Sequence, residues 1–381
     1  MPTRVSVPGE LIAWARERSR VSVEELTRRY PQLPEWERGV GAPTLNQLER
    51  FAASTHTPVG YFFLSRPPVE ELPLPDFRTL RDEAVSRPSP DLLDTIVGCQ
   101  RRQEWYRDHL RATGSDRPDV VGRLSMADSA PAAAASMRTA LKYAVGTRGN
   151  SWGAAFRRLA EHAEDLGVLV MVNGVVGSNT HRKLDPEEFR GFALVDEYAP
   201  VVFVNGADTK AAQIFTLAHE LAHIWLGESG VDNPDPNRAS DQAVERWCSQ
   251  VAAELLVPES VLRAEWAGDT SADELDRLAA RFRVSTLVVL RRLYDTGQLN
   301  RDTYRQRYAD ELDRVLALID ARTGSGGNFY NTQPTRTSKR FARALVASTL
   351  EGQTLYRDAF QLLGFKKRAT FDALAERLGV L

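Results

Sequence analysis

Cysteine is scarce in this sequence of 381 residues: only Cys99 and Cys248 are present, far apart along the chain. Two thiols are too few for a disulfide framework, and they exclude a zinc site built from thiolates alone. No stretch approaches the roughly 18 apolar residues that a membrane-spanning helix needs. The first residues also lack the apolar core of a secretory signal peptide. We therefore expect a cytoplasmic protein.

An excess of charge of either sign is lacking as well. Lys and Arg number 49 against 51 Asp and Glu, which gives a formal net charge of −2 at pH 7. This balance argues against a protein that coats nucleic acid over its whole surface, although local basic segments remain possible. Hydrophobic residues make up 43% of the chain, an ordinary globular share. A chain of this length is too long for one compact core, so we expect several modules.

Proline, glycine and apolar residues divide the chain into five predicted parts. Residues 1–68 have the pattern of short helices. Closely spaced prolines favour extended backbone, so 69–90 is predicted to be a linker. A helical lead-in and a core with strands follow over 91–262. Residues 263–323 are predicted to be a helical extension, and 324–381 a basic helical module.

The fold class is predicted from residues 91–262, where strand-like runs are followed by stretches with helical periodicity. Three short β-branched runs, at 168–172, 191–195 and 201–204, are separated by Gly, Asn and Pro and predict strands. Two amphipathic helices are predicted after them, at about 209–226 and 240–256. The sequence therefore predicts a mostly helical α+β protein with a small sheet.

The first of these two helices contains an H-E-x-x-H motif, formed by His219, Glu220 and His223. Residues four apart on a helix lie one turn above each other, so both imidazoles can bind one ion. Gly227 stands where a helix usually ends. An apolar stripe beside the two histidines supports the helix independently: Ile214, Phe215, Ala218, Leu221, Ala222 and Trp225. The motif predicts one bound Zn²⁺ per chain.

A catalytic zinc takes three protein ligands and leaves one position for water, so a third ligand is needed. Glu245 fits, because it borders the apolar stripe of the helix that is predicted to begin at Ser240. A carboxylate there is costly unless it is paired or bound to metal. Asp241, one turn earlier, is the alternative ligand. Cys248 is expected to be a small buried apolar residue of the core.

Glu220 points in another direction than the two histidines, so its predicted role is catalytic. Zinc lowers the pKa of bound water, and Glu220 can accept the proton as this water attacks a polarised carbonyl. The oxyanion would need a second donor. Tyr198 and His181 are the candidates, and the sequence does not choose between them.

At these residues the chain resembles the ImmA/IrrE family of bacterial metallopeptidases. The resemblance covers about 165–262 and extends beyond the H-E-x-x-H motif. It includes Glu188-Phe189-Arg190-Gly191-Phe192-Ala193-Leu194, Pro200-Val201-Val202-Phe203-Val204-Asn205 and Phe215-Thr216-Leu217-Ala218. From Glu245 to Pro258 the chain follows the family pattern E-x-x-A-N-x-F-A-x-x-L-L-x-P, with Cys248, Ser249 and Val251 in place of its Ala, Asn and Phe. Ser249 is thus a candidate to form a hydrogen bond that orients one of the metal ligands.

The resemblance implies a gluzincin-like arrangement in which Glu245 is a ligand. It also implies limited proteolysis of a regulatory protein, of the helix-turn-helix repressor or antitoxin type. Residues 272–300 resemble the helical extension that follows the family's peptidase core. A cytoplasmic regulatory zinc metallo-endopeptidase is the first functional hypothesis.

Residues 8–68 resemble an XRE-type helix-turn-helix module, which precedes the peptidase in some members of the family. The resemblance depends on Trp36-Glu37-Arg38-Gly39, Pro43-Thr44 and Gln47-Leu48. Pro31 and Pro34 fall where the recognition helix should run, and proline breaks a helix interior. Base readout needs side chains on an intact helix. DNA binding and a structural or partner-binding role both stay open for this module.

The basic module at 324–381 follows a Gly-Ser-Gly-Gly joint at 324–327 and is rich in Arg and Lys. Either these cations form a solvated helical face, or they bind an acidic protein partner or nucleic acid. The candidate binding residues are Arg336, Lys339, Arg340, Arg343, Lys366, Lys367 and Arg368.

Two other functions compete with the peptidase. One is a transcriptional regulator or antitoxin-like binding protein in which zinc is mainly structural, because nothing in the sequence marks a substrate pocket. The other is a zinc hydrolase of a non-peptide amide. Glu220 favours an enzyme, since a purely structural zinc site does not need it.

Overall fold

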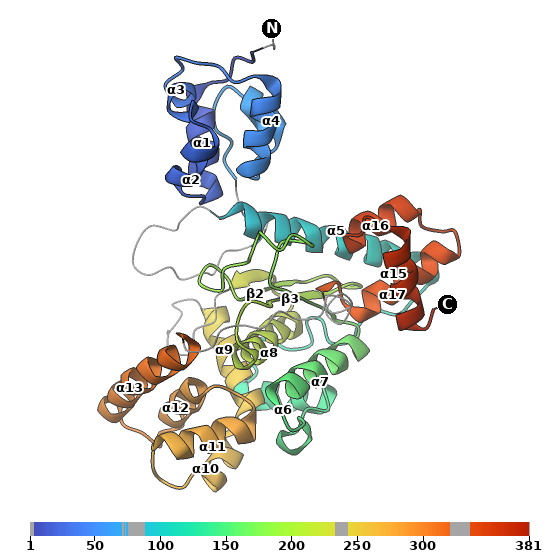
Figure 1. Ribbon diagram of the computed structural model, residues 1–381. Coiled ribbons are helices and arrows are strands. Elements are labelled where there is room, and N and C mark those ends of the chain that lie inside the picture. The colour runs from blue at the N-terminus through green and yellow to red at the C-terminus, as the bar shows by residue number, and fades with distance from the viewer. Residues whose placement is uncertain are drawn as a thin grey trace. The chain divides into compact units, whose positions relative to one another are not determined.

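The computed structural model describes residues 4–70, 72, 74, 88–232, 243–320 and 336–380 (Figure 1). The chain divides into two compact units: residues 1–73 with 80–96, and residues 74–79 with 97–381. Most of the predicted linker at 69–90 and all of the predicted joint at 324–327 lie outside the described residues. In the described part of the chain, no helix is both long and apolar enough to cross a membrane.

The first unit consists of short helices around one aromatic core. These helices are α1 (Gly9–Ser19), α2 (Val23–Arg29), α3 (Leu33–Glu37), α4 (Leu45–Ser54) and the 3₁₀ helix η1 (Val59–Phe63). The Ser22 side chain accepts a hydrogen bond from the Glu25 N–H and caps α2. Phe51 packs edge-on against Trp36, with ring centroids 6.3 Å apart. The unit therefore has a hydrophobic core of its own.

Four strands form the sheet of the second unit in the order β1-β3-β2-β4. The strands are β1 (Leu169–Asn173), β2 (Gly191–Leu194), β3 (Val201–Asn205) and β4 (Gly230–Asp232). The pairing of β1 with β3 is parallel, and the other two pairings are antiparallel. The three strands predicted from the sequence are confirmed, and β4 is an addition, since three residues are too short to give a recognisable alternation.

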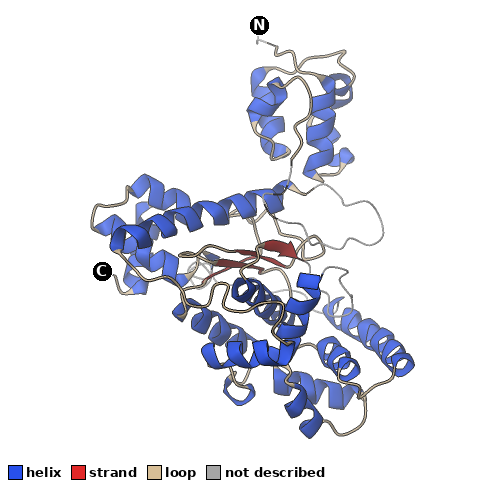
Figure 2. Ribbon diagram, turned by 180° about the vertical axis from the view of Figure 1, so that it is seen from behind, coloured by secondary structure: helices blue, strands red, loops and turns tan. Residues whose placement is uncertain are grey.

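Alternation along the strands gives the sheet two different faces. Val202 and Val204 belong to the same core cluster as α8 (Lys210–Leu226). Phe192 and Phe203, which are directly paired in the register, stack on the other face with ring centroids 4.9 Å apart. Figure 2 shows the sheet between α5 (Pro90–Thr113) on one side and α8 on the other. Successive side chains of a strand thus point to opposite faces of the sheet and pack into the core on each side.

Helix α8 has no exposed side over most of its length, because every residue from 213 to 225 is buried. It packs against β2 and β3, and also against α7 (Trp152–Asp165) and α9 (Ala243–Leu256). Its N-terminus is capped by the Thr209 side chain. Its C-terminus ends at Gly227, whose φ of 82° is left-handed, as predicted for this glycine. The helix that contains the H-E-x-x-H motif is therefore central to the unit.

The remaining helices surround this centre. They are α6 (Ala130–Ala140), η2 (Val145–Thr147), α10 (Glu259–Glu265), α11 (Ala272–Phe282), α12 (Thr286–Asp295), α13 (Arg301–Asp320), α15 (Lys339–Leu350), α16 (Tyr356–Leu363) and α17 (Arg368–Leu378). The last three, red in Figure 1, lie beside the later part of α5. There Phe341 packs edge-on against Trp105 at 5.5 Å, and Arg102 donates to the Leu362 carbonyl. The mostly helical α+β class is confirmed.

Candidate metal centre

Helices α8 and α9 bring His219, His223 and Glu245 together. The two His Nε2 atoms are 3.1 Å apart. Glu245 Oε2 is 3.1 Å from His219 Nε2, and Glu245 Oε1 is 3.1 Å from His223 Nε2. All three side chains are buried, none more than 2% exposed. The two predicted ligands of α8 and the predicted ligand of α9 therefore face one point.

The donor atoms fit a metal ion in number, kind and spacing. Tetrahedral zinc with bonds of about 2.0–2.1 Å has neighbouring ligand atoms about 3.3 Å apart. The three separations of 3.1 Å are close to that edge length. Two imidazoles and one carboxylate are also the donor set of a catalytic metal site that leaves a position for water. The described residues contain this one group of three or more His, Cys, Asp or Glu side chains able to hold an ion.

The electrostatics of the centre favour an ionised carboxylate. Burial raises the pKa of the Glu245 carboxyl, but hydrogen bonds and charge from His219 and His223 outweigh burial and hold the pKa well below its usual range. A carboxylate that stays charged while buried is in the protonation state that a metal ligand needs. Asp241, the alternative ligand, and Ser240 lie outside the described residues.

Glu220 is fully buried beside the centre, between the two histidines in sequence. Gly191 of β2 provides the room for its carboxylate. A Cβ added at Gly191 would lie 3.0 Å from Glu220 Oε1, 2.8 Å from the Phe203 carbonyl oxygen and 2.5 Å from Thr216 Cγ2. Any larger residue at this strand position must displace backbone or the carboxylate itself. The glycine therefore allows β2 to approach the H-E-x-x-H helix closely.

The other predicted site residues lie in different surroundings. Ser249 Oγ is 3.4 Å from His219 Nδ1, so α9 contributes both Glu245 and a polar group that contacts the other nitrogen of a predicted ligand. Tyr198 lies in the β2–β3 turn, where Arg111 and Arg117 each lie 4.9 Å from its ring centre. His181 is exposed on the loop between β1 and β2. Among the described contacts, none joins Tyr198 or His181 to the centre.

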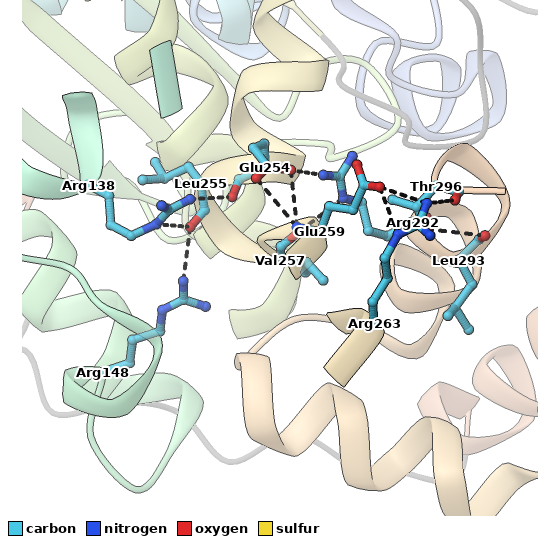
Figure 3. A network of polar contacts seen from close by, with 10 residues as sticks. All are labelled: Arg138, Arg148, Glu254, Leu255, Val257, Glu259, Arg263, Arg292, Leu293 and Thr296. Atoms are coloured by element: carbon cyan, nitrogen blue, oxygen red, sulfur yellow. Dashed lines mark hydrogen bonds and ion pairs between the residues drawn. The ribbon is translucent and has the colours of Figure 1, made fainter. Parts of the chain in front are cut away.

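Three arginines from three other elements hold the C-terminal end of α9 (Figure 3). Arg138 of α6 donates to the Glu254 carbonyl at 2.6 Å. Arg148, which follows η2, is 1% exposed and donates to the carbonyls of Leu255, Leu256 and Phe282. Arg292 of α12 donates to the Val257 carbonyl at 3.0 Å and pairs with the Glu254 carboxylate.

Guanidinium groups at a helix C-terminus satisfy its free carbonyls and complement its dipole. Burial lowers the pKa of Arg148 to about 10, so the side chain is still charged at neutral pH. The sequence reasoning missed this network, because scattered arginines carry no spacing that predicts a common target. Its effect is to fix the helix that holds Glu245.

The basic residues predicted to bind a partner have mixed surroundings. Lys339 Nζ is 2.8 Å from Glu161, and Arg340 Nε donates to the Tyr106 hydroxyl at 2.8 Å. Arg343 donates to the Leu378 carbonyl, and Arg368 pairs with Asp372. Arg336 is half-buried, whereas Lys366 and Lys367 are exposed. Lys339 and Arg340 thus contact the rest of the second unit.

Comparison with known families bears on the segment that contains the centre. Residues 163–294 match the model of the IrrE N-terminal-like domain, Peptidase M78. The match includes the sheet, α8 and α9, and it supports both the ImmA/IrrE resemblance and a metallopeptidase role. Residues 337–377 match a domain of unknown function, DUF8813. No curated protein matches the chain.

Proposed function

We propose that this protein is a regulatory zinc metallo-endopeptidase with a gluzincin-like centre, and that it cleaves a repressor-type or antitoxin-type protein partner. The observation that supports the proposal is the buried triangle of His219, His223 and Glu245 with Glu220 adjacent in α8. A structural metal site needs no additional buried carboxylate at this position. Glu220 is therefore the residue that favours catalysis over a purely structural role.

Zinc suits the donor set better than other common metals. Imidazole nitrogens are good ligands for zinc, and carboxylate is accepted as the third. Mg²⁺ and Ca²⁺ prefer oxygen ligands, of which the triangle offers only those of Glu245. We expect one Zn²⁺ per chain, held by His219, His223 and Glu245.

In this proposal each residue of the site has a separate role in the reaction. Bound zinc supplies Lewis acidity and lowers the pKa of water. Zinc binding requires the neutral form of His219 and His223, and Ser249 orients the ring of His219 through Nδ1. Glu220 holds the attacking water, accepts its proton, and delivers that proton to the nitrogen of the leaving amine. Burial of the carboxylate keeps competing water away from this transfer.

The experiment compares the wild type with Glu220→Gln in cells that produce the protein, with new protein N-termini identified by mass spectrometry. We expect a small set of cleavage products that disappears in Glu220→Gln, while purified wild type and variant contain equal amounts of zinc. Identical sets of new termini in both strains would contradict the peptidase proposal. Because the new termini of all cellular proteins are compared, the cleaved partner is identified by the same measurement.

A DNA-binding regulator with a structural zinc is the second candidate. The observation in its favour is that residues 4–70 form a separate helical unit with its own core. The short α3 argues against it, because five residues with Pro34 in the first turn offer little surface to a DNA groove. A reporter of the regulated gene separates the two functions: this candidate requires Glu220→Gln to regulate as the wild type does.

A further inference from the structure

A cavity of about 940 Å³ lies between α7 and the C-terminal helices α15 and α17. Its floor is formed by side chains that are almost fully buried: Tyr106 of α5, Phe156 of α7 and Val170 of β1. None of the residues that line it belongs to the metal centre. Its volume is within the range of pockets that hold small-molecule ligands, about 300–1,000 Å³.

The lining of this cavity carries an excess of positive charge. Five cations face three carboxylates, a net charge of +2: Arg157, Lys339, Arg340, Arg343 and Arg377 against Glu161, Glu164 and Asp165. Two of the carboxylates already have partners from α15. Lys339 Nζ pairs with Glu161 at 2.8 Å, and the Lys339 main-chain N–H donates to Glu164 Oε1 at 3.0 Å. These contacts hold the two walls of the cavity together.

Two of the other lining cations, Arg157 and Arg343, are not paired with a carboxylate in any contact that the structure describes. Arg157 makes no ion pair or hydrogen bond with another side chain or carbonyl that the structure describes. Arg343 donates to the Leu378 carbonyl at 3.3 Å, a neutral acceptor. An anion in the cavity would therefore find two guanidinium groups whose charge no described carboxylate neutralises.

We propose that this cavity binds a small molecule with phosphate groups, of about nucleotide size, held by Arg157 of α7 and Arg343 of α15. Guanidinium groups bind phosphate through paired, charge-assisted hydrogen bonds. The buried rings of Tyr106 and Phe156 provide an apolar floor for the rest of the molecule.

A small ligand fits better than a macromolecule. The two guanidiniums come from two different helices that line the cavity, Arg157 from α7 and Arg343 from α15, while Lys366, Lys367 and Arg368 do not line it. Lys339 and Arg340 use their side chains for contacts with α7 and α5. The proposal does not depend on peptidase activity, because the cavity and the metal centre share no residue.

The test is calorimetric titration of the full-length protein with inorganic pyrophosphate and, separately, with ADP. We expect at least one of them to bind with micromolar to submillimolar affinity. Equal affinities would mean that phosphate alone is recognised, and tighter binding of ADP would mean that the apolar floor contributes. The double variant Arg157→Ala/Arg343→Ala should lose about tenfold or more in affinity, because two charge-assisted contacts are removed.

Arg357→Ala is the matched control, since Arg357 belongs to α16, its side chain is 83% exposed, and the ion pair that the structure describes for it is with the adjacent Asp358. It should bind both probes as the wild type does, and all three proteins should unfold at similar temperatures. The proposal is wrong if neither probe binds at millimolar concentration, or if the double variant keeps wild-type affinity. A third titration uses an oligonucleotide. The proposal is also wrong if the double variant loses affinity for the oligonucleotide but not for pyrophosphate or ADP.

Discussion

Arg148 donates a hydrogen bond to the carbonyl of Leu256, the last residue of the helix that begins near Glu245. Glu245, the proposed metal ligand, and Arg148 therefore lie at opposite ends of one helix. Arg148 also donates to Phe282 at the end of α11, so a single buried guanidinium connects two helix C-termini. A buried cation is tolerated there because carbonyl groups and helix dipoles surround it.

Replacing Arg148 should destabilise the second unit. Arg148→Met keeps most of the volume but removes the Arg148 donor from the Leu256 and Phe282 carbonyls and one of two arginine donors from the Leu255 carbonyl, so we expect a loss of about 3 kcal/mol in the free energy of unfolding. Arg158→Met is the control: it removes an exposed arginine with one hydrogen bond to the Thr147 carbonyl and should cost about 0.5 kcal/mol or less. Denaturant unfolding measures both. Equal losses in the free energy of unfolding would show that the arginine network in Figure 3 does not stabilise the unit more than an exposed arginine does.

Removing both imidazoles should abolish metal binding. His219→Ala/His223→Ala leaves a single carboxylate of the triangle, which cannot hold zinc alone. Elemental analysis should find about one zinc per chain in the wild type and in Glu220→Gln, and none in the double variant. Stoichiometric zinc in the double variant would place the metal elsewhere in the chain.

Gly191→Ala tests the close approach of β2 to the H-E-x-x-H helix. The added methyl would meet the Phe203 carbonyl and the Glu220 carboxylate at 2.8 and 3.0 Å, so backbone or carboxylate must move. We expect a destabilisation of about 1–3 kcal/mol and a loss of the proposed peptidase activity. Gly153→Ala in α7, where nothing lies within 4 Å of the new methyl, should cost nothing measurable. The interpretation fails if the two variants behave alike.

Asp196 gives a prediction about pH. Burial raises its pKa, but N–H groups of Ala199 and Tyr198 and the guanidinium of Arg107 outweigh burial, so the pKa lies below the ordinary 3.8. A carboxyl whose pKa is lowered in the folded protein stabilises the fold at pH values above its ordinary pKa. This contribution is lost as the pH falls through the lowered pKa. Asp196→Asn should therefore be less stable than wild type at neutral pH. The difference should shrink below about pH 4. A difference independent of pH would assign the effect to the turn rather than to the charge.

DNA binding by residues 1–68 is expected to be weak. The helix at the position of the recognition helix, α3, has five residues and includes Pro34. Gel-shift titration of the full-length protein against the DNA upstream of its own gene, at physiological salt, tests this. Sequence-specific affinity in the range of about 10⁻⁸ to 10⁻¹¹ M, typical of specific DNA-binding proteins, would overturn the expectation.

Much of the centre was predictable because its signals are local. The i,i+4 spacing of His219 and His223, the apolar stripe beside them and Gly227 all belong to one helix, and the structure has that helix at Lys210–Leu226. Glu245 was predictable from the polarity of one position on the next amphipathic helix. The structure brings these three side chains within 3.1 Å of each other.

Features that depend on contacts between distant segments were not predictable. The three arginines at the end of α9 lie 35 or more residues from the carbonyls they bind, and no periodic pattern relates them. The same is true of the cavity, whose walls are α7 and α15.

Burial of residues 213–225 of α8 has a consequence for hydrogen exchange. Backbone amides in this stretch have no solvent-facing side from which local fraying could start, so they should exchange only when the whole unit opens. His219 and His223 belong to that slowest-exchanging segment. Ion binding there adds to the free energy of global opening by mass action. Withdrawal of the ion should therefore accelerate exchange throughout the second unit, well beyond the turns that touch it.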